Sequence, residues 1–393
     1  METIGIPSDA WRQGPPIREL GEFGLIARIR ERIERVAGVA PPAGVAPPAG
    51  VALPAGLAPA AGGEHVARGE RAGGVTVLGI GDDAAVLRPL PGWDLLLTCD
   101  VLVEGRHFRR EWIGPREMGA RAAEINLSDI AAMGGLPVGA LVSLVLPGDL
   151  SLSALDEIYE GMIAALGMYG ARIVGGNIAT SDCLFLDVTL VGRVETGKAL
   201  RRGGARPGEV VFVTGYPGHA GAALEALAAG PSVWESLAGR PGAAGLIERL
   251  RLHHAAPRAR VAVGRYLVEN EIATAAIDLS DGLAGDLAHI CEESGVGIQL
   301  EENFLPVDED LRILGAELER DPVRWVLGAS DDYELIFTAP LARADLAFAA
   351  AGLFGLGVRP IGSVVAGPAG VRLHRRDGSS AELQGGWDHL RGS

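Results

Sequence analysis

Apolar residues recur along the chain at two spacings, and each spacing predicts a different kind of element. In residues 17–36 they return every three or four positions among arginines and glutamates, which predicts an amphipathic helix. From residue 75 onward, short apolar runs typical of strands alternate with helical stretches, so the fold class is predicted to be mixed α/β. We expect strands at 95–98, 138–146, 171–174, 184–194, 210–213, 334–338 and 361–365, with another running into Asp278. We expect helices at 116–133, 152–169, 219–229, 258–270 and 282–294.

Two breaks in this pattern divide the chain. Residues 38–63 repeat a six-residue Pro/Ala/Gly unit that has no face to bury, so we expect a disordered linker there. A turn cluster at 203–208 separates two α/β series. We therefore predict an N-terminal helical segment at 1–37, the linker at 38–63, an N-terminal domain at 64–195 and a C-terminal domain at 196–393.

Composition narrows the class of protein and of partner. With 48% hydrophobic residues and a mean hydropathy of +0.22, the 393-residue chain is predicted to be globular. Its 35 basic and 50 acidic residues give a net charge of −15, which repels nucleic acids and anionic lipid surfaces. We therefore expect no nucleic acid and no membrane as a partner. An acidic protein that binds a phosphate substrate must reduce this repulsion locally, and bound divalent cations are the simplest means.

The cysteines and the N-terminus indicate the compartment. Cys99, Cys183 and Cys291 are scattered and set in apolar sequence, which predicts reduced, buried thiols in a cytoplasmic protein. Residues 1–13 contain no basic segment followed by an apolar stretch, so no secretory signal is predicted. The longest uncharged run, 36–63, is interrupted by prolines and is not expected to span a bilayer.

Acidic motifs recur in apolar or glycine-rich surroundings, where surface charges are not expected. They are Asp82-Asp83, Thr98-Cys99-Asp100, Asn126-Leu127-Ser128-Asp129, Gly175-Gly176-Asn177, Asp278-Leu279-Ser280-Asp281-Gly282 and Asp331-Asp332-Tyr333-Glu334. Adjacent aspartates repel one another, so a folded site that holds them near other acids requires cations. We predict that the motifs converge on one site that binds Mg²⁺ and a polyphosphate.

Most of these motifs also have a plain structural explanation. The first aspartate pair suits an ordinary turn, Asp100 suits the end of a buried strand, and Asp281 suits the N-cap of a helix. Asp129 shares an otherwise apolar helix face with an asparagine three residues earlier, where a polar pair is the alternative to a metal ligand. Asp278, at the end of a buried strand, has no such explanation.

Other candidate chemistry is weaker. Residues 192–198 match the spacing of a phosphate-binding loop, but Ala199 stands where a Mg²⁺-binding Ser or Thr is required, so a turn is predicted. Arg202 is either a phosphate ligand or a solvated surface residue. His253 and His254 are predicted to lie in a loop, with no nucleophile beside them.

In this order, the motifs resemble those of the thiamine-monophosphate kinase family, from residues 21–26 to 386–390. The family shares a superfamily with aminoimidazole-ribotide synthetase, selenide water dikinase and a hydrogenase maturation factor. The resemblance implies a two-domain aminoimidazole-ribotide synthetase-like architecture, in which an N-terminal mixed sheet with helices binds ATP and Mg²⁺ and a C-terminal α/β domain completes the active site. It also implies ATP-dependent phosphorylation of thiamine monophosphate to thiamine diphosphate by direct in-line transfer, and a homodimer.

The resemblance further implies roles for single residues. It implies Mg²⁺ ligands at Asp83, Thr98, Cys99, Asp100, Asp129, Asn177, Asp278 and Asp281, with Asp129, Asp278 and Asp281 as the catalytic set. It implies ATP contacts from Gly176, Arg202 and Ser280, and thiamine monophosphate contacts from His107, Asp331 and Trp387. Two positions depart from the family pattern: Asn177 replaces an Asp, which makes a neutral ligand, and Asp331 replaces a Glu.

Two alternatives stay open at this point. One is a related ATP-dependent enzyme that acts on another small acceptor, and the other is a non-catalytic divalent-cation-binding protein. Within the superfamily, selenide water dikinase needs a reactive cysteine or selenocysteine in an N-terminal loop, and no cysteine precedes Cys99. The hydrogenase factor depends on a C-terminal cysteine, whereas this chain ends at Ser393.

Overall fold

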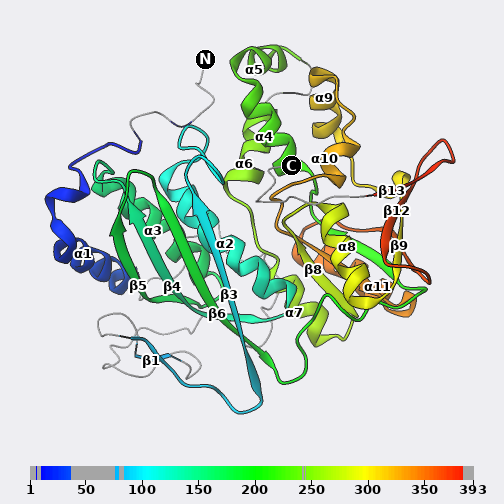
Figure 1. Ribbon diagram of the computed structural model, residues 1–393, viewed down its shortest axis with the longest axis horizontal. Coiled ribbons are helices and arrows are strands. Elements are labelled where there is room, and N and C mark those ends of the chain that lie inside the picture. The colour runs from blue at the N-terminus through cyan, green and yellow to red at the C-terminus, as the bar shows by residue number, and fades with distance from the viewer. Residues whose placement is uncertain are drawn as a thin grey trace. The chain divides into compact units, whose positions relative to one another are not determined.

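The computed structural model describes residues 6, 10–36, 76–78, 84–240, 243 and 245–383, which form two compact units (Figure 1). Unit 1 consists mainly of Thr3–Ile130 and Gly135–Lys198, and unit 2 of Ala131–Gly134 and Ala199–Ser393. The predicted linker at 38–63 lies outside the described residues. The predicted domain limits stay predictions.

Unit 1 is built on a four-stranded sheet with the order β3-β6-β4-β5. The strands are β3 (Trp93–Val103), β4 (Leu136–Leu146), β5 (Arg172–Thr180) and β6 (Phe185–Glu195). β6 runs antiparallel to β3 and β4, and β5 runs parallel to β4. A 3-10 turn (Ile17–Glu19) precedes α1 (Gly21–Val36), and α2 (Pro115–Ala132) and α3 (Leu152–Gly167) lie across one face of the sheet (Figure 1). A separate small sheet pairs β1 (Thr76–Leu78) with β2 (Val86–Leu87).

Two glycines allow the backbones of α2 and α3 to touch. A Cβ atom on Gly119 of α2 would lie 1.8 Å from the carbonyl oxygen of Ile158. One on Gly161 of α3 would lie 2.0 Å from the carbonyl oxygen of Arg116. Because no side chain fits at either position, α2 is packed tightly against α3, and the carboxylate of Asp129 on α2 is positioned by the helix packing.

The opposite face of the unit 1 sheet is open and apolar. Side chains alternate along β3, so Leu95, Leu97 and Val101 point to this face, where they are 41%, 71% and 38% exposed. Leu141 of β4 lies in the same cross-strand row as Cys99 and is 41% exposed. An exposed apolar sheet face of this kind is typical of an interaction surface.

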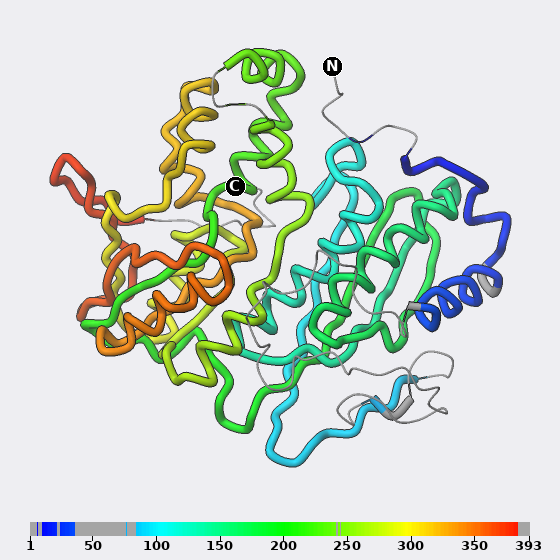
Figure 2. Tube along the Cα trace, turned by 180° about the vertical axis from the view of Figure 1, so that it is seen from behind, coloured from blue at the N-terminus to red at the C-terminus, as the bar shows by residue number. Residues whose placement is uncertain are grey.

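Unit 2 contains a seven-stranded sheet with the order β13-β12-β9-β11-β7-β10-β8. Its strands are β7 (Val210–Thr214), β8 (Ala275–Leu279), β9 (Gly297–Glu301), β10 (Glu334–Ala339), β11 (Val358–Val365), β12 (Gly370–His374) and β13 (Ser380–Leu383). Only β9 and β12 pair in parallel. The last two strands form the hairpin coloured red to orange in Figure 2.

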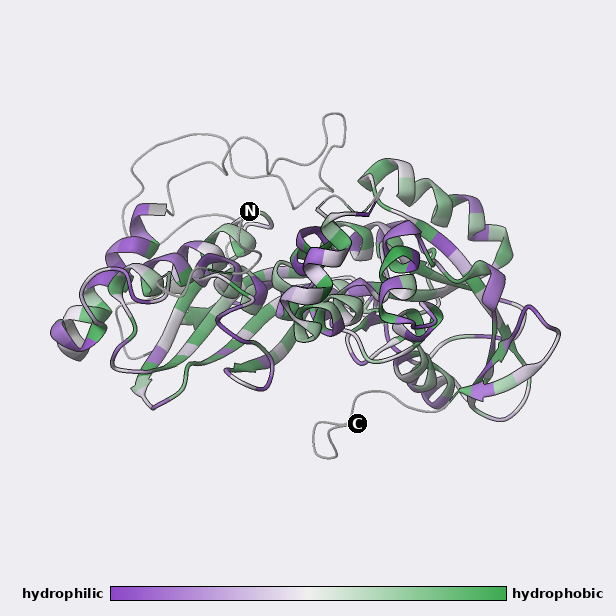
Figure 3. Ribbon diagram, turned by 90° about the horizontal axis from the view of Figure 1, so that it is seen from above, coloured by the Kyte–Doolittle hydropathy of each residue, from purple (hydrophilic) through white to green (hydrophobic). Residues whose placement is uncertain are grey.

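Helices flank this sheet, and the strands of both units are largely green in the hydropathy view of Figure 3. The helices are α4 (His219–Ala229), α5 (Pro231–Ala238), α6 (Leu246–Ala255), α7 (Val261–Glu269), α8 (Leu283–Ser294), α9 (Glu309–Leu318), α10 (Val323–Leu327) and α11 (Ala344–Phe354), with 3-10 turns at Glu302–Phe304 and Leu341–Arg343. In the core, the rings of Phe212 and Phe337 stack with centroids 5.2 Å apart. Within the described ranges, no helix has the length and apolar character needed to cross a membrane.

Most predicted helices and strands are confirmed to within four residues at each end, but β3 and β5 end five and six residues later than predicted, and several local predictions were wrong. No helix was predicted at residues 231–238, which form α5 with Pro231 in its first turn, where a missing N–H costs nothing. His253 and His254 lie in the last turn of α6 and not in a loop. Asp100 lies inside β3 and not at its end, because pairing with β6 continues to Val103.

The three cysteines are free thiols, as predicted, but they are not all buried. Cys291 is buried, Cys183 is half-buried and Cys99 is exposed. The apolar neighbours of Cys99 suggested burial on both sides of the strand. The structure differs because β3 lies at the sheet edge and Cys99 points to the open face.

His219 joins α4 to the start of α9 through two hydrogen bonds. Its Nε2 lies 3.0 Å from Asp308 Oδ2, and its Nδ1 lies 3.1 Å from the carbonyl oxygen of Tyr216. Both partners are acceptors, so the imidazole satisfies both only when both nitrogens carry protons. Burial lowers the pKa of His219, but the hydrogen bond and charge of Asp308 outweigh it and hold the pKa above 6.5. Neighbouring His253 stays neutral, because burial and the charge of His219 lower its pKa to about 4.

This contact predicts a pH-dependent contribution to stability. The folded pKa of His219 is above the unfolded value, so the stabilisation is complete below pH 6.5 and is lost as the pH rises through the folded pKa. Asp308→Asn should therefore cost more unfolding free energy at about pH 6 than at about pH 9, by about 1.4 kcal/mol for each unit of pKa difference. Urea denaturation at both pH values measures this. His289→Gln, a change on a surface histidine, serves as the control, and an equal Asp308→Asn cost at both pH values contradicts the assignment.

Candidate functional site

In unit 1, a strand and a helix bring three predicted site residues together. Thr98 and Asp100 lie two residues apart on β3, on the face covered by α2, and Asp129 lies on α2. The hydroxyl of Thr98 donates a hydrogen bond to Asp129 Oδ2. Burial, followed by the charge of Asp129 and a hydrogen bond to it, raises the pKa of Asp100 to about 7. A proton or a cation placed between the two carboxyl groups would relieve their repulsion.

The predicted ligand Cys99 points away from this cluster. Its thiol donates to Asp187 Oδ1 at 3.0 Å and accepts from the Thr189 hydroxyl at 3.4 Å, on the open face of the sheet. Thr98 and Asp100 point to the other face because side chains alternate along a strand. A metal bound by those two residues can use only the backbone carbonyl of Cys99, so its role as a ligand stays a prediction.

Gly176 and Asn177 lie on β5, at the opposite edge of the sheet from β3. Two strands separate these edges, which is roughly 14 Å at the usual strand spacing. Within the unit, the structure therefore does not bring Asn177 to Asp100. Gly176 has a structural requirement of its own, because a Cβ atom there would lie 2.0 Å from the carbonyl oxygen of Val142.

His107 lies in the turn that follows β3. Its Nδ1 accepts a hydrogen bond from the backbone N–H of Val103 at 3.1 Å, and its own N–H donates to the carbonyl oxygen of Val103 at 2.9 Å. The side chain is half-buried. The contact fixes the imidazole against the end of β3, and a role for His107 toward a substrate stays a prediction.

In unit 2, a short connection from β8 to α8 carries a second group of predicted residues. Asp278, 5% exposed, lies on β8, and Ser280 and Asp281 follow the strand. Asp281 does not cap α8: the N-cap residue is Gly282, and no side chain caps it. Instead, Asp286 Oδ2 in the first turn accepts the backbone N–H groups of Ser280 at 3.0 Å and Asp281 at 3.2 Å. The connection is thus held by a carboxylate that the sequence analysis did not single out.

Asp286 shows how charge is arranged around this connection. It is 2% exposed, and burial and then the charge of Asp281 raise its pKa to about 7. The two backbone hydrogen bonds and the positive charge of Arg202 act in the opposite direction. The predicted nucleotide residues Arg202 and Ser280 therefore lie around the same carboxylate. One sequence signal was available: Asp286 occupies the apolar stripe of α8 together with Leu287.

Close backbone contacts hold Arg202 beside β8 and α8. The N–H of Ala276 on β8 donates to the carbonyl oxygen of Arg201 at 2.9 Å. Ser294 Oγ, at the end of α8, accepts the N–H groups of Gly204 and Ala205, both at 3.1 Å. Gly204 has a φ of +141°, and a Cβ atom there would lie 2.3 Å from the carbonyl oxygen of Thr274. Only glycine fits at this position.

The Asp331 segment lies against the same connection. A Cβ atom on Gly282 would lie 2.1 Å from the carbonyl oxygen of Gly328, so the two backbones touch. Asp331 Oδ2 lies 3.9 Å from Nδ1 of the buried His254. The next residue, Asp332, anchors the segment by accepting the N–H groups of Gly218 at 2.6 Å and Ala220 at 2.9 Å at the start of α4. The structure thus brings Asp331 near the residues that follow β8.

Two predicted site residues, Asp83 and Trp387, lie outside the described residues. Among the residues that the structure describes, no three His, Cys, Asp or Glu side chains gather closely enough to hold a metal ion. The donor chemistry nevertheless fits Mg²⁺, which prefers carboxylate and hydroxyl oxygens and few protein ligands. The convergence of all the acidic motifs on one site stays a prediction.

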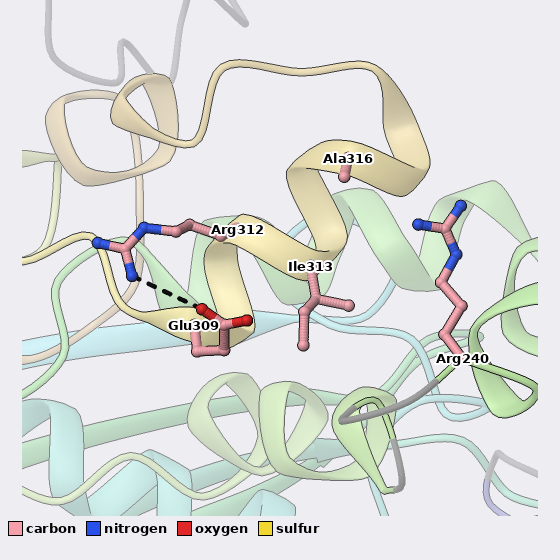
Figure 4. Close-up of a pocket in the computed structure, with 5 residues that line it drawn as sticks. All are labelled: Arg240, Glu309, Arg312, Ile313 and Ala316. Carbon is pink, nitrogen blue, oxygen red and sulfur yellow. Dashed lines mark ion pairs between the residues drawn. The ribbon is translucent and has the colours of Figure 1, made fainter.

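A shallow depression of about 580 Å³ in unit 2 contains none of the predicted site residues (Figure 4). It is lined by Arg240, Glu309, Arg312, Ile313 and Ala316. Glu309 pairs with Arg312 at 3.7 Å, and Arg240 pairs with Glu317 of the same helix, α9. Its charges are satisfied on the surface, so it offers no chemistry comparable to that around Asp286.

Comparison with known proteins identifies the family. The family models "AIR synthase related protein, N-terminal domain" and "AIR synthase related protein, C-terminal domain" match residues 81–194 and 206–374. The chain is 39% identical over 264 residues to a thiamine-monophosphate kinase of Aquifex aeolicus (strain VF5), covering 67% of this chain and 81% of the relative. It is 35% identical over 315 residues to that of Escherichia coli (strain K12), covering 80% and 92%.

A solved structure gives the same result. AaThiL complexed with AMPPCP and TMP is 31% identical, with a TM-score of 0.66, and the match covers 96% of this chain and 99% of that one. The resemblance inferred from the motifs and the predicted two-domain α/β fold class are both confirmed. This chain therefore belongs to the thiamine-monophosphate kinase family of enzymes.

Proposed function

We propose that this chain transfers the γ-phosphoryl group of ATP to thiamine monophosphate, giving thiamine diphosphate and ADP. The observation that carries the proposal is the similarity, over 96% of the chain, to AaThiL complexed with AMPPCP, an ATP analogue, and TMP. The arrangement of Arg202 and Ser280 beside buried aspartates provides the charged and amide groups that a nucleotide phosphate requires. The free thiols are those expected of a cytoplasmic enzyme, which is the location we propose.

The proposed reaction requires little covalent chemistry from the protein. The acceptor is a phosphate that is already anionic, so no general base is needed, and catalysis reduces to alignment and charge neutralisation. When bound, Mg²⁺ would neutralise the charge of the transferring group. Each unit has its own residues that would hold such a cation: Thr98, Asp100 and Asp129 in unit 1, and Asp278 and Asp281 in unit 2.

The remaining residues would position the substrates for an in-line transfer. The guanidinium of Arg202 carries a permanent positive charge beside Asp286. A phosphate group of the nucleotide could pair with this charge in place of the Asp286 carboxylate. Asp331, anchored through its neighbour Asp332, would meet the cationic part of thiamine monophosphate. The replacement of Glu by Asp at 331 shortens that side chain by one methylene, so the acceptor must approach the backbone more closely.

The chain also carries a surface suited to self-association. The open face of the unit 1 sheet presents Leu95, Leu97, Val101 and Leu141 to solvent. We propose that a second copy covers this face in a homodimer, because an isologous contact buries the same apolar patch on both copies.

The proposed reaction predicts that the protein forms thiamine diphosphate only when ATP, thiamine monophosphate and Mg²⁺ are all present. Removal of metal with a chelator should abolish turnover, and added Mg²⁺ should restore it. Chromatography of the products measures this, with aminoimidazole-ribotide precursor as the comparison acceptor. Turnover of the comparison acceptor alone would assign another reaction, and nucleotide-independent Mg²⁺ binding without turnover would make the chain a cation-binding protein.

The predicted metal ligands can be tested with isosteric changes. Asp129→Asn and Asp278→Asn should each lower kcat by about 10²–10³-fold, because a neutral amide no longer balances the cation charge. Circular dichroism should show both variants folded. Asp94→Asn is the matched control: its carboxylate lies on β3 as well but is exposed and accepts only from Thr196 and Gly197. Near-normal rates in both variants at saturating Mg²⁺ would remove these residues from the metal site.

The proposed dimer predicts that a charge on the open sheet face separates the copies. Leu97→Glu should shift the protein from dimer to monomer in analytical ultracentrifugation, because a buried carboxylate there would have no partner. Leu341→Glu is the control, since Leu341 is equally exposed, 73% against 71%, but lies in unit 2. A Leu97→Glu variant that sediments like the unchanged chain would place the contact elsewhere.

A further inference from the structure

Asp286 is the polar side chain that fixes the backbone between β8 and α8. The strand ends at Leu279 and the helix begins at Leu283, so only three residues connect them. A single oxygen of Asp286, Oδ2, accepts the N–H groups of the first two. The third residue, Gly282, has no side chain to cap the helix.

Backbone packing and a backbone hydrogen bond hold the two ends of the connection. Gly282 has a φ of +104° and touches the backbone at Gly328, so that end of the connection is held by packing. At the other end, Tyr333 donates its N–H to the carbonyl oxygen of Leu279 at 2.8 Å. Between these two points, the backbone N–H groups of Ser280 and Asp281 both donate to Asp286.

The position of Asp286 is costly for a carboxylate. The side chain is 2% exposed and lies beside the negative charge of Asp281, so removal from water and repulsion both oppose it. Two backbone donors and the charge of Arg202 offset these costs. What Asp286 contributes to the connection is the pair of hydrogen bonds to its backbone.

We propose that Asp286 is a positioning residue, which holds the Ser280–Asp281 backbone so that both side chains meet the nucleotide and its cation. This inference rests on the proposed function, because the roles of Ser280 and Asp281 belong to it. The geometry separates two demands on residue 286. The N–H contacts require an acceptor oxygen at one place, whereas a purely electrostatic role would require a negative charge but tolerate a shift of its position.

Three substitutions distinguish these demands. Asp286→Asn keeps an acceptor oxygen in place and removes the charge, Asp286→Glu keeps the charge and displaces the oxygens by one methylene, and Asp286→Ala removes both. If Asp286 acts through position, Asp286→Asn should stay within about threefold of the unchanged chain in the KM for ATP. Asp286→Glu and Asp286→Ala should raise this KM and the Mg²⁺ concentration for half-maximal rate by about tenfold or more.

A control separates positioning from general destabilisation. Asp308→Ala removes another unit 2 carboxylate that accepts a backbone N–H, that of Leu311 at 3.1 Å, and should lower the melting temperature without changing the KM for ATP. Calorimetric titration of each variant with AMPPCP in the presence of Mg²⁺ should give the same ranking for nucleotide affinity alone. If the unchanged chain binds AMPPCP but forms no thiamine diphosphate, the proposed function fails while the binding ranking still tests Asp286.

Two results would overturn the inference. If Asp286→Glu binds AMPPCP more tightly and turns over faster than Asp286→Asn, then the charge of residue 286 matters and not the position of its oxygen. A folded Asp286→Ala with unchanged KM and unchanged AMPPCP affinity would make Asp286 a purely structural residue. If Asp286→Ala does not fold, the ranking of the Asn and Glu variants decides between the same two outcomes.

Discussion

The structure depends on how buried carboxylates are compensated. An ionised carboxylate in a protein interior requires a positive charge, hydrogen-bond donors or a proton. Glu334 is fully compensated: burial raises its pKa, but Arg260 and the donors Thr214 and Tyr216 lower it below the ordinary value. It is a structural ion pair. Asp100 and Asp286 are compensated only in part, and the pKa of each rises to about 7. Partial compensation leaves both groups ready to accept a proton or to face a cation.

This contrast separates structural acids from candidate functional ones. Asp332 is also buried, and its pKa rises to about 6 although it accepts two backbone N–H groups at the start of α4. Asp100 and Asp129 face one another across β3 and α2, and the hydroxyl of Thr98 donates to Asp129. Asp286 and Asp332 both accept backbone N–H groups, whereas Asp100 and Asp129 face one another, so the kind of partner around each carboxylate, more than its burial, separates the acids that hold backbone from those that could face a cation.

Glycine provides the close backbone contacts that put these groups in place. Gly119 and Gly161 let α2 approach α3, which sets the position of Asp129. Gly282 lets the connection after β8 touch the backbone at Gly328, which places Asp331 near Ser280 and Asp281. A methyl group at any of these positions would overlap a backbone carbonyl, so the chain would have to shift. The glycines of the acidic motifs thus serve the site by geometry and not by chemistry.

The sequence by itself determined the elements and the family. Apolar periodicity located the helices around Asp129 and after Asp281, because burial of a helix face imposes its own spacing on the chain. The order of the acidic motifs identified the family, because each motif keeps its residue types in a fixed pattern. Only the tertiary structure decided which carboxylates meet. Asp286 was overlooked, Cys99 points to the open sheet face, and Asn177 lies at the far sheet edge from Asp100. Strand order and the facing of side chains arise from contacts between residues distant in sequence, which local periodicity does not encode.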